Sequence, residues 1–447
     1  MFMGKYFGTD GFRGEANKVL NVEHAYKVGR YLGWHYGKEH KCKVVIGKDT
    51  RRSSYMFEYS LVAGLVASGA DVYLLHVTTT PSVSYVARTE DFDCGIMISA
   101  SHNPYYDNGI KLINSRGEKM SESMLLDIEN YIDGELGEIP FATGENIGCT
   151  VDYAAGRNRY IGYIISLACH SYKGINVGLD CSNGSTWMLA KSIFDALGAS
   201  TFVINNRPDG LNINENCGST HIEQLQKFVV ENNLDIGFAF DGDADRCIAV
   251  DENGNELNGN HILYICAEYM KNKGELNQNT VVSTVMCNMG LDKALDGLDI
   301  KSVKTDVGDK NIYEAMQKNS LSLGGEESGH IIFSKYGTTG DGLITAIKIM
   351  EIFIESKLPL SKLTEDFVLY PQITKKIRVD DKEAAICDSD IAAEKQKAEN
   401  ELNGNGRVVL RKSGTEPVIR VMVEAENEKQ CDDICTALID KIAAKGY

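Results

Sequence analysis

Three features are missing from this sequence. No run of about 18 apolar residues occurs, so no stretch is long enough for a membrane-spanning helix. Residues 1–14 are polar and rich in glycine, without the apolar core of a signal peptide, and we therefore expect a cytoplasmic chain. Net positive charge is also missing: the formal charge is -17 at pH 7, which argues against nucleic acid and anionic membranes as partners. An anionic small substrate would need a local basic pocket.

Cys-x-x-Cys pairs, a spacing typical of zinc ligands, are absent as well. The chain has 12 cysteines, but none of them forms a Cys-x-x-Cys pair. Most stand singly in apolar runs, and Cys431 and Cys435 share one face of an expected C-terminal amphipathic helix. We interpret the cysteines as reduced core residues and not as zinc ligands or disulfide partners.

The length of the chain indicates several domains. It has 447 residues, 43% of them hydrophobic, which is enough for about three domains of ~150 residues with sizeable cores. A unit of strand, polar turn, helix and strand begins near Val44, again near Asn176 and again near Val281, each about thirty residues long like one β-α-β crossover. From about Glu365 the pattern changes to a strand, a charged helix, two strands and a terminal helix.

We therefore predict an α/β fold of three tandem similar domains with mixed sheets, followed by a smaller C-terminal α+β domain. The predicted domains are residues 1–150, 151–252, 253–364 and 365–447.

One stretch carries a candidate nucleophile. Ser101 follows the apolar, strand-like residues 94–98, so it should stand on a turn at the C-terminal end of a strand, where open α/β sheets keep their chemistry. His102 is a titratable neighbour, a proline follows, and Lys111 lies ten residues on. The set suits phosphoryl transfer, but an ordinary Asn-Pro turn with a capping serine explains this stretch equally well.

A second stretch carries candidate metal ligands. Asp241, Asp243 and Asp245 alternate on a glycine-containing turn between two apolar strands, and such oxygens suit a hard divalent cation. An EF-hand loop has similar spacing, but Arg246 occupies the position of its required glycine and the flanks read as strands. A solvated acidic turn without metal is the other alternative, although three unpaired carboxylates repel one another unless a cation or Arg246 offsets them.

Two further loops present polar side chains. Residues 7–14 form a glycine-punctuated loop that presents Thr9 and Arg13, and a simple surface turn is the alternative. Residues 324–330 crowd carboxylates, a serine and His330 on a turn that matches sugar hydroxyls, although a glycine turn with ordinary capping has the same pattern.

The last such loop lies between two expected strands. Residues 411–420 combine cations, hydroxyls and free backbone N–H groups, which together make a phosphate cradle. A hairpin with a basic edge is the alternative.

Four of these stretches resemble the signature motifs of the α-D-phosphohexomutase family, and they stand in the family's order over nearly the whole chain. They are SASHNP at 99–104, DGDADR at 241–246, GEESGH at 325–330 and RKSGTEP at 411–417. Residues 4–11, 208–214, 217–221 and 338–342 further resemble a bacterial branch of that family. This branch interconverts glucosamine 6-phosphate and glucosamine 1-phosphate on the route to UDP-N-acetylglucosamine.

The resemblance implies four domains around a central cleft and a role for each motif. Ser101 matches the phosphoserine, and the three aspartates match the Mg²⁺ ligands, with a phosphoryl oxygen on Ser101 as the fourth. The implied catalytic residues are Ser101, His102, Lys111, Arg246 and His330, with Lys111 and His330 as acid/base candidates. The implied substrate-binding residues are Thr9, Arg13, Glu326, Ser328, Arg411, Ser413, Gly414, Thr415 and Arg420. The implied metal ligands are Ser101, Asp241, Asp243 and Asp245.

The implied reaction passes through a 1,6-bisphosphate. Phosphoserine would donate its phosphoryl group to the free hydroxyl of the substrate, while Mg²⁺ and nearby cations offset the developing charge. The intermediate would then turn around, held by one phosphate cradle on a mobile last domain. We expect a sugar 1,6-bisphosphate as activator, a phosphosugar as substrate and a homodimer as the assembly.

Three positions depart from the branch. Glu327 stands where glutamine is usual, Lys310 stands for arginine, and Asn260 stands for aspartate. Phosphomannomutase or phosphoglucomutase activity with the same machinery therefore stays open. A non-catalytic sugar-phosphate or metal-binding sensor is a further alternative, although a sensor would not need the nucleophile.

Overall fold

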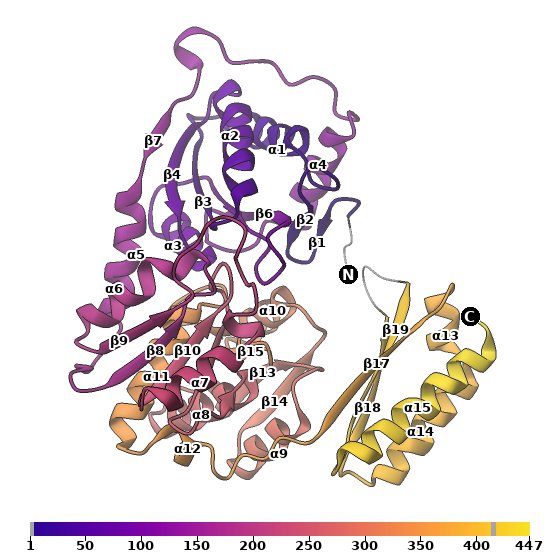
Figure 1. Cartoon of the computed structure of the whole chain (residues 1–447). Helices are drawn as coiled ribbons and strands as arrows, with labels where there is room; N and C mark the ends of the chain where they lie inside the picture. The colour runs from indigo at the N-terminus through magenta and orange to yellow at the C-terminus, as the bar shows by residue number, and fades with distance from the viewer. Residues whose placement is uncertain (1–3, 413–416) are drawn as a thin grey trace. The chain divides into compact units, whose positions relative to one another are not determined.

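The computed structural model describes residues 4–412 and 417–447 (Figure 1). The chain folds into two compact units. The first comprises Met1–Thr284 and Val303–Thr364, and the second comprises Val285–Ser302 and Glu365–Tyr447. The segment Val285–Ser302, which the sequence assigns to the third domain, thus belongs to the same compact unit as the C-terminal part.

The first sheet of the first unit carries the candidate nucleophile. Its strands are β1 (Phe7–Gly8), β2 (Gly11–Glu15), β3 (Lys43–Lys48), β4 (Asp71–Val77), β5 (Cys94–Ile98), β6 (Asp107–Asn114) and β7 (Thr150–Asp152). They lie in the order β1-β2-β6-β5-β3-β4-β7. The strand β3 pairs in parallel with β4 and β5, whereas β6 runs antiparallel to β5 and β2. The sheet is therefore mixed, as predicted.

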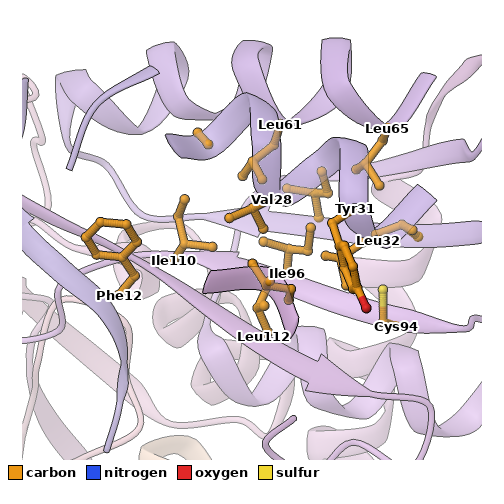
Figure 2. Close-up of a cluster of buried hydrophobic side chains, with 14 of the residues drawn as sticks. Phe12, Val28, Tyr31, Leu32, Leu61, Leu65, Cys94, Ile96, Ile110 and Leu112 are labelled. Atoms are coloured by element: carbon orange, nitrogen blue, oxygen red, sulfur yellow. The ribbon is translucent and has the colours of Figure 1, made fainter. Parts of the chain in front are cut away.

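Helices cover both faces of this sheet. They are α1 (Val22–Tyr36), α2 (Arg52–Ala67), α3 (Thr80–Thr89) and α4 (Glu122–Ile132). Figure 2 shows the face under α1 and α2, where Val28 and Leu61 pack over Ile96 of β5. The next residue of β5, Met97, packs with Val83 of α3 on the other face. Because successive strand residues face opposite ways, a continuous apolar run such as residues 94–98 belongs in a strand covered on both sides.

Two glycines let α1 and α2 cross closely. A Cβ at Gly64 of α2 would overlap the carbonyl of Tyr26 in α1, and a Cβ at Gly29 of α1 would overlap the carbonyl of Leu61. No larger residue fits at either point without moving a backbone. The crossing therefore depends on glycine for space and not for an unusual φ.

The second sheet carries the acidic turn. Its strands and neighbouring helices are α5 (Ala154–Ser166), β8 (Asn176–Asp180), α6 (Leu189–Ala196), β9 (Ser200–Ile204), α7 (Glu223–Glu231), β10 (Ile236–Phe240), β11 (Cys247–Val250) and β12 (Glu256–Leu257). The strand order is β12-β11-β10-β8-β9, parallel from β10 to β9 and antiparallel at β11.

The third sheet carries the predicted sugar-binding loop. Its elements are α8 (Gly259–Asn272), β13 (Thr280–Thr284), β14 (Lys301–Thr305), α10 (Asp309–Asn319), β15 (Leu323–Gly325), β16 (Ile331–Phe333), α11 (Gly342–Ser356) and α12 (Leu360–Leu363). The order is β14-β13-β15-β16, with β13 parallel to β15 and β16 antiparallel to it.

The second unit contains an antiparallel sheet in the order β17-β19-β18. Its elements are α9 (Met289–Gly297), β17 (Gln372–Arg378), α13 (Lys382–Cys387), α14 (Ser389–Leu402), β18 (Arg407–Lys412), β19 (Val418–Glu424) and α15 (Glu428–Lys445). Arg407 pairs through Nε and Nη2 with the fully buried Glu424. The same carboxylate accepts the N–H of Met289 at 2.9 Å. This carboxylate ties the segment around α9 to the sheet.

The sequence-based interpretation of the fold is confirmed in its main points. Each sheet carries one of the four motif loops at an antiparallel reversal, namely β5–β6, β10–β11, β15–β16 and β18–β19. Cys431 and Cys435 lie buried in the core of the second unit, and the cysteines are free thiols, but Cys149, Cys169 and Cys387 are exposed, so the interpretation as core residues is wrong for these three. Within the described ranges, no helix is both long and apolar enough to cross a bilayer.

The close crossing of α1 and α2 gives a stability prediction. Gly64→Ala should lower the free energy of unfolding by about 1–3 kcal/mol, because the added methyl group overpacks the helix contact. As a control, Gly162→Ala makes the same change inside α5, where a Cβ meets nothing within 4 Å. It should raise the free energy of unfolding by about 0.5–1 kcal/mol, because alanine favours the helix. Urea denaturation of both variants measures the difference, and equal effects would contradict the close contact.

Candidate active site

The candidate nucleophile lies on the turn after β5, where the sequence predicts it. Ser101 has only 1% of its surface exposed, and its φ of 52° is in the left-handed region that non-glycine residues rarely adopt. Its Oγ donates a hydrogen bond to Oδ2 of Asp241 at 2.6 Å, and Nδ1 of His102 lies 3.3 Å from the same Oγ. The turn therefore directs the hydroxyl at the acidic turn of the second sheet.

The acidic turn joins β10 to β11 and presents three buried carboxylates. Asp241, Asp243 and Asp245 each offer one oxygen, and these atoms lie within 4.8 Å of one another. In the described part of the chain, Oδ1 of Asp243 and Oδ1 of Asp245 are buried without a hydrogen-bond partner. Converging carboxylate oxygens of this kind fit a hard divalent cation. Strands flank the turn, which agrees with the rejection of an EF-hand.

The charges on this turn are unequal. Burial raises the pKa of Asp241 well above its ordinary value, and the charges of Asp245 and Asp243 raise it further. Burial also opposes ionisation of Asp245, but Lys111 and His330 outweigh it and hold the pKa of that carboxyl well below its ordinary value. Protein cations thus stabilise one carboxylate better than its neighbour, and a metal ion would relieve the remaining repulsion.

Lys111 is the central cation of the site. It lies on β6 with its Nζ 2.8 Å from Oδ2 of Asp243, 3.1 Å from Oδ2 of Asp245 and 3.2 Å from Oδ2 of Asp10. Burial lowers the pKa of Lys111, but these three carboxylates outweigh it and raise the pKa well above the ordinary value. The ammonium group is therefore held in the charged state.

Asp10 is a site residue that the sequence reasoning missed. It lies on the turn between β1 and β2, contacts Arg13 through an ion pair, and accepts a hydrogen bond from Lys119 at 2.8 Å. Lys119 also reaches Asp309 at 2.6 Å. The available signal was an aspartate between two glycines in the loop that presents Thr9 and Arg13, but nothing local shows that Lys111 lies opposite.

The predicted sugar-binding loop turns between β15 and β16. Ser328 donates to Oε2 of Glu326 at 3.4 Å, and Oε1 of Glu326 accepts the N–H of Gly308 at 3.1 Å. The carbonyl of Gly329 accepts the N–H of Cys247 in β11 at 3.0 Å. The loop is thus attached to the strand that follows the acidic turn, which brings both motifs to one place.

His330 connects this loop to the acidic turn. Its Nδ1 lies 3.7 Å from Oδ1 of Asp245, and its Nε2 accepts the N–H of Gly340 at 3.0 Å. Burial lowers the pKa of His330, but Asp245, Asp309 and Glu326 outweigh it and raise the pKa to about 9. Because the hydrogen bond from Gly340 needs the lone pair on Nε2, the neutral form of His330 keeps its proton on Nδ1, facing Asp245.

His102 and Arg246 differ in charge. Burial, together with Arg246, Arg13 and Lys111, lowers the pKa of His102 to about 3, so its imidazole is neutral at pH 7. The backbone N–H of Arg246 donates to Oδ1 of Asp241 at 3.2 Å, and its Nε lies 3.9 Å from Oδ1 of Asp245. Arg246 therefore supplies positive charge directly beside the carboxylates.

A cavity of about 630 Å³ opens beside this cluster in the first unit. Thr9, Lys111 and Asp245 line it at the cluster, and Lys310 and Thr339 line it farther away. Its volume lies in the range of small-molecule sites. The motifs of the first three sheets meet through the Ser101–Asp241 hydrogen bond and the His330–Asp245 contact, and Asp245 is the motif residue that lines the cavity.

The fourth motif belongs to the second unit. Arg411 of β18 and Arg420 of β19 are direct register partners, so the two cations face each other across the antiparallel pair. Ser413, Gly414 and Thr415 lie outside the described residues. The phosphate cradle itself stays a prediction, and the described residues contribute this arginine pair to it.

Family comparisons cover nearly the whole chain. The phosphoglucomutase/phosphomannomutase alpha/beta/alpha domain I matches residues 4–137, domain II residues 158–254, domain III residues 258–370, and the C-terminal domain residues 375–441. A curated relative from Lachnospira eligens, named phosphoglucosamine mutase, is 66% identical over 448 residues and covers 100% of both chains.

Solved structures share the fold. A phosphoglucomutase/phosphomannomutase family protein from Burkholderia thailandensis has a TM-score of 0.81 at 22% identity, covering 100% of this chain and 99% of that one. An N-acetylphosphoglucosamine mutase from Aspergillus fumigatus, solved with GlcNAc-6P and magnesium, has a TM-score of 0.69 at 16% identity, covering 99% and 96%. The chain therefore belongs to the phosphoglucomutase/phosphomannomutase family, and within it to the group of the phosphoglucosamine mutases.

Proposed function

We propose that this chain interconverts glucosamine 6-phosphate and glucosamine 1-phosphate through a phosphorylated Ser101 and a sugar 1,6-bisphosphate. One observation carries the proposal: the buried Oγ of Ser101 lies 2.6 Å from Oδ2 of Asp241, at the edge of three converging carboxylates. A nucleophilic hydroxyl beside a cation site is the arrangement that phosphoryl transfer needs. The full-length relative at 66% identity supports the choice of sugar.

The reaction is a transfer between two oxygens. In the first half, the bond from phosphorus to Ser101 Oγ breaks, and a bond forms from phosphorus to the free hydroxyl of the substrate. The hydroxyl loses its proton to a base of the site, and Ser101 Oγ takes up a proton from an acid. We assign the acid and base roles to Lys111 and His330, which approach different oxygens of Asp245. The second half runs the same steps in reverse with the other phosphate.

Mg²⁺ is the proposed cation. Asp241, Asp243 and Asp245 would hold it, together with a phosphoryl oxygen on Ser101. Bound there, it would offset the negative charge that develops on the transferred phosphoryl group. Lys111 and Arg246 add fixed positive charge on the protein side of the same group, and the neutral His102 flanks Ser101 without adding charge.

Other residues would hold the substrate. Glu326 and Ser328 would present a carboxylate and a hydroxyl to the sugar hydroxyls, and Thr9 and Arg13 would contribute from the loop of residues 7–14. The non-reacting phosphate would bind the loop of the second unit, formed by Arg411, Ser413, Gly414, Thr415 and Arg420. A sugar 1,6-bisphosphate would serve as activator, because it restores the phosphate on Ser101.

The organisation of the chain follows from one motif per sheet. We propose domains at residues 1–150, 151–252, 253–364 and 365–447, each carrying one motif loop. A cytoplasmic location suits a charged phosphosugar, which does not cross membranes unaided. The homodimer remains a prediction from the family resemblance.

The three departures from the branch have defined surroundings. Lys310 forms an ion pair with Glu122 at 2.6 Å, and Asn260 is buried at the start of α8. The carbonyl of Glu327 accepts the N–H of Gly259 at 2.9 Å. These contacts involve neither the acidic turn nor Ser101, and we propose that the departures bear on sugar preference.

The choice of sugar is tested by comparing three substrates. With Mg²⁺ and a trace of glucose 1,6-bisphosphate, the chain should convert glucosamine 6-phosphate with a higher kcat/KM than glucose 6-phosphate or mannose 6-phosphate. Coupled assays on the three sugars measure this. Preference for mannose or glucose phosphate would assign the alternative mutase activity, and binding without isomerisation of any of them would favour the sensor.

The nucleophile is tested by Ser101→Ala. This variant should lose turnover, because no other oxygen can accept the phosphoryl group, and it should gain no phosphate from glucose 1,6-bisphosphate. Intact-mass analysis with peptide mapping follows the phosphate. Ser123→Ala, on the exposed side of α4, should keep both activity and phosphorylation. Near-native turnover in Ser101→Ala would contradict the scheme.

The cation site is tested by Asp243→Asn. Removing one carboxylate should weaken Mn²⁺ binding, used as a probe for Mg²⁺, by at least about tenfold. Isothermal titration calorimetry measures it without reference to activity. Asp195→Asn, which removes an exposed carboxylate on α6, should leave the affinity unchanged. Equal affinity in all three proteins would place the cation elsewhere.

A further inference from the structure

The nucleophile loop has two inward-facing carbonyl groups that need donors. Ser101 stands in the left-handed region, and the carbonyls of Ser101 and Asn103 both point toward buried side chains. A carbonyl removed from water without a donor destabilises the conformation that places it there. The donors at these two oxygens therefore decide whether the loop keeps its shape.

One donor comes from the same sheet. Arg51, on the turn after β3, is fully buried, and its Nη2 donates to the carbonyl of Ser101 at 3.1 Å and to that of Asn103 at 2.5 Å. An ion pair with the equally buried Asp49 balances its charge. The first domain thus supplies one half of the support.

The other donor comes from the second domain. Nδ2 of Asn214 donates to the carbonyl of Ser101 at 2.8 Å and to that of Asn103 at 3.1 Å. Asn214 is 8% exposed and ends the stretch 208–214, which follows β9. Each of the two carbonyls therefore receives one donor from each domain.

The backbone around Asn214 is itself fixed. Asn214 has a φ of 58°, and its N–H donates to the carbonyl of Ser182 at 2.9 Å. Ser182 donates its N–H to Oδ1 of Asp180 at 2.8 Å, and Oδ2 of Asp180 accepts the N–H of Gly218 at 2.9 Å. One buried carboxylate at the end of β8 thus fixes both Ser182, which contacts Asn214, and Gly218, which follows the segment that carries Asn214.

The stretch also docks onto the first domain. Gly210 accepts the N–H of Arg52 at 3.0 Å, at the start of α2, and Asn183 accepts the hydroxyl of Thr50 at 2.6 Å. A Cβ at Gly242 of the acidic turn would meet both Ser101 and Asn214. The nucleophile loop, the acidic turn and residues 208–214 therefore pack without spare room.

We propose that residues 208–214 act as a clamp on the nucleophile loop, and that Asn214 is a positioning residue for phosphoryl transfer. Asn214 contacts the main chain of the loop and not Ser101 Oγ, so it acts by keeping that oxygen 2.6 Å from Asp241. The clamp gives a function to a stretch that phosphoryl transfer itself does not use. The inference rests on the proposed function in taking Ser101 as the nucleophile.

Asn214→Asp tests the clamp with almost no change in shape. A carboxylate cannot donate, and it repels the two carbonyl oxygens that it would face. We expect kcat for glucosamine 6-phosphate to fall about 100-fold with KM nearly unchanged, because the nucleophile is misplaced while the substrate-binding loops are intact. Hydrogen exchange in the peptide covering residues 99–107 should become faster.

Two further variants separate positioning from charge and from folding. Asn214→Gly removes the donor without adding charge and tolerates the positive φ, so kcat should fall by about tenfold. Asn216→Asp makes the same chemical change at an exposed residue with a φ of 52°, two positions along. It should keep the wild-type kcat and exchange rates.

The outcomes separate the clamp from the proposed function. Unchanged kcat and unchanged exchange in Asn214→Asp would overturn the clamp, as would a lower melting temperature with unchanged kcat per folded molecule. If the wild type does not turn over glucosamine 6-phosphate but exchange at 99–107 rises only in the Asn214 variants, the clamp stands and the proposed substrate fails.

Discussion

The site depends on the balance of charge around Lys111. Its ammonium lies within 3.2 Å of carboxylate oxygens from Asp10, Asp243 and Asp245; Lys111 and the last two are buried, and the side chain of Asp10 is partly exposed. Buried charges are stable only when they are paired and hydrogen-bonded, so each of these groups is held in place by the others. The backbone N–H of Thr80, the first residue of α3, donates to the carbonyl of Asp243 at 2.9 Å and fixes the acidic turn from a further side.

This balance also explains why the acidic turn still suits a cation. The protein cations stabilise Asp245 strongly, while the pKa of Asp241 stays raised by burial and by its two acidic neighbours. A site with complete internal pairing would gain little from a metal ion. In the described chain, Oδ1 of Asp243 and Oδ1 of Asp245 are buried without a hydrogen-bond partner, on the turn whose Asp241 accepts the hydrogen bond of the candidate nucleophile. The same unsatisfied oxygens and the repulsion among the three carboxylates, which would destabilise an empty turn, favour metal binding.

The first three sheets place their motifs in the same way. In the first three sheets, a parallel strand ends, the chain reverses, and the motif occupies the reversal before an antiparallel strand. The reversals let short loops project from rigid strands, which holds reactive side chains more firmly than long loops would. The proposed clamp at Asn214 adds support at the reversal that holds Ser101 in the left-handed region.

The sequence by itself determined the local features: apolar runs that form strands, the turn after residue 98, the acidic turn without an EF-hand, and the helical face that buries Cys431 and Cys435. These depend on residue spacing and turn chemistry, which neighbouring residues fix. The sequence did not identify four other residues of the site, because their partners lie far along the chain. They are Asp10, Lys119, Arg51 and Asn214. Asp10 meets Lys111 only because β2 pairs with β6, and Asn214 meets Ser101 only because the stretch after β9 docks on the first sheet. Such contacts follow from strand pairing and domain packing, and therefore only the tertiary structure decided them.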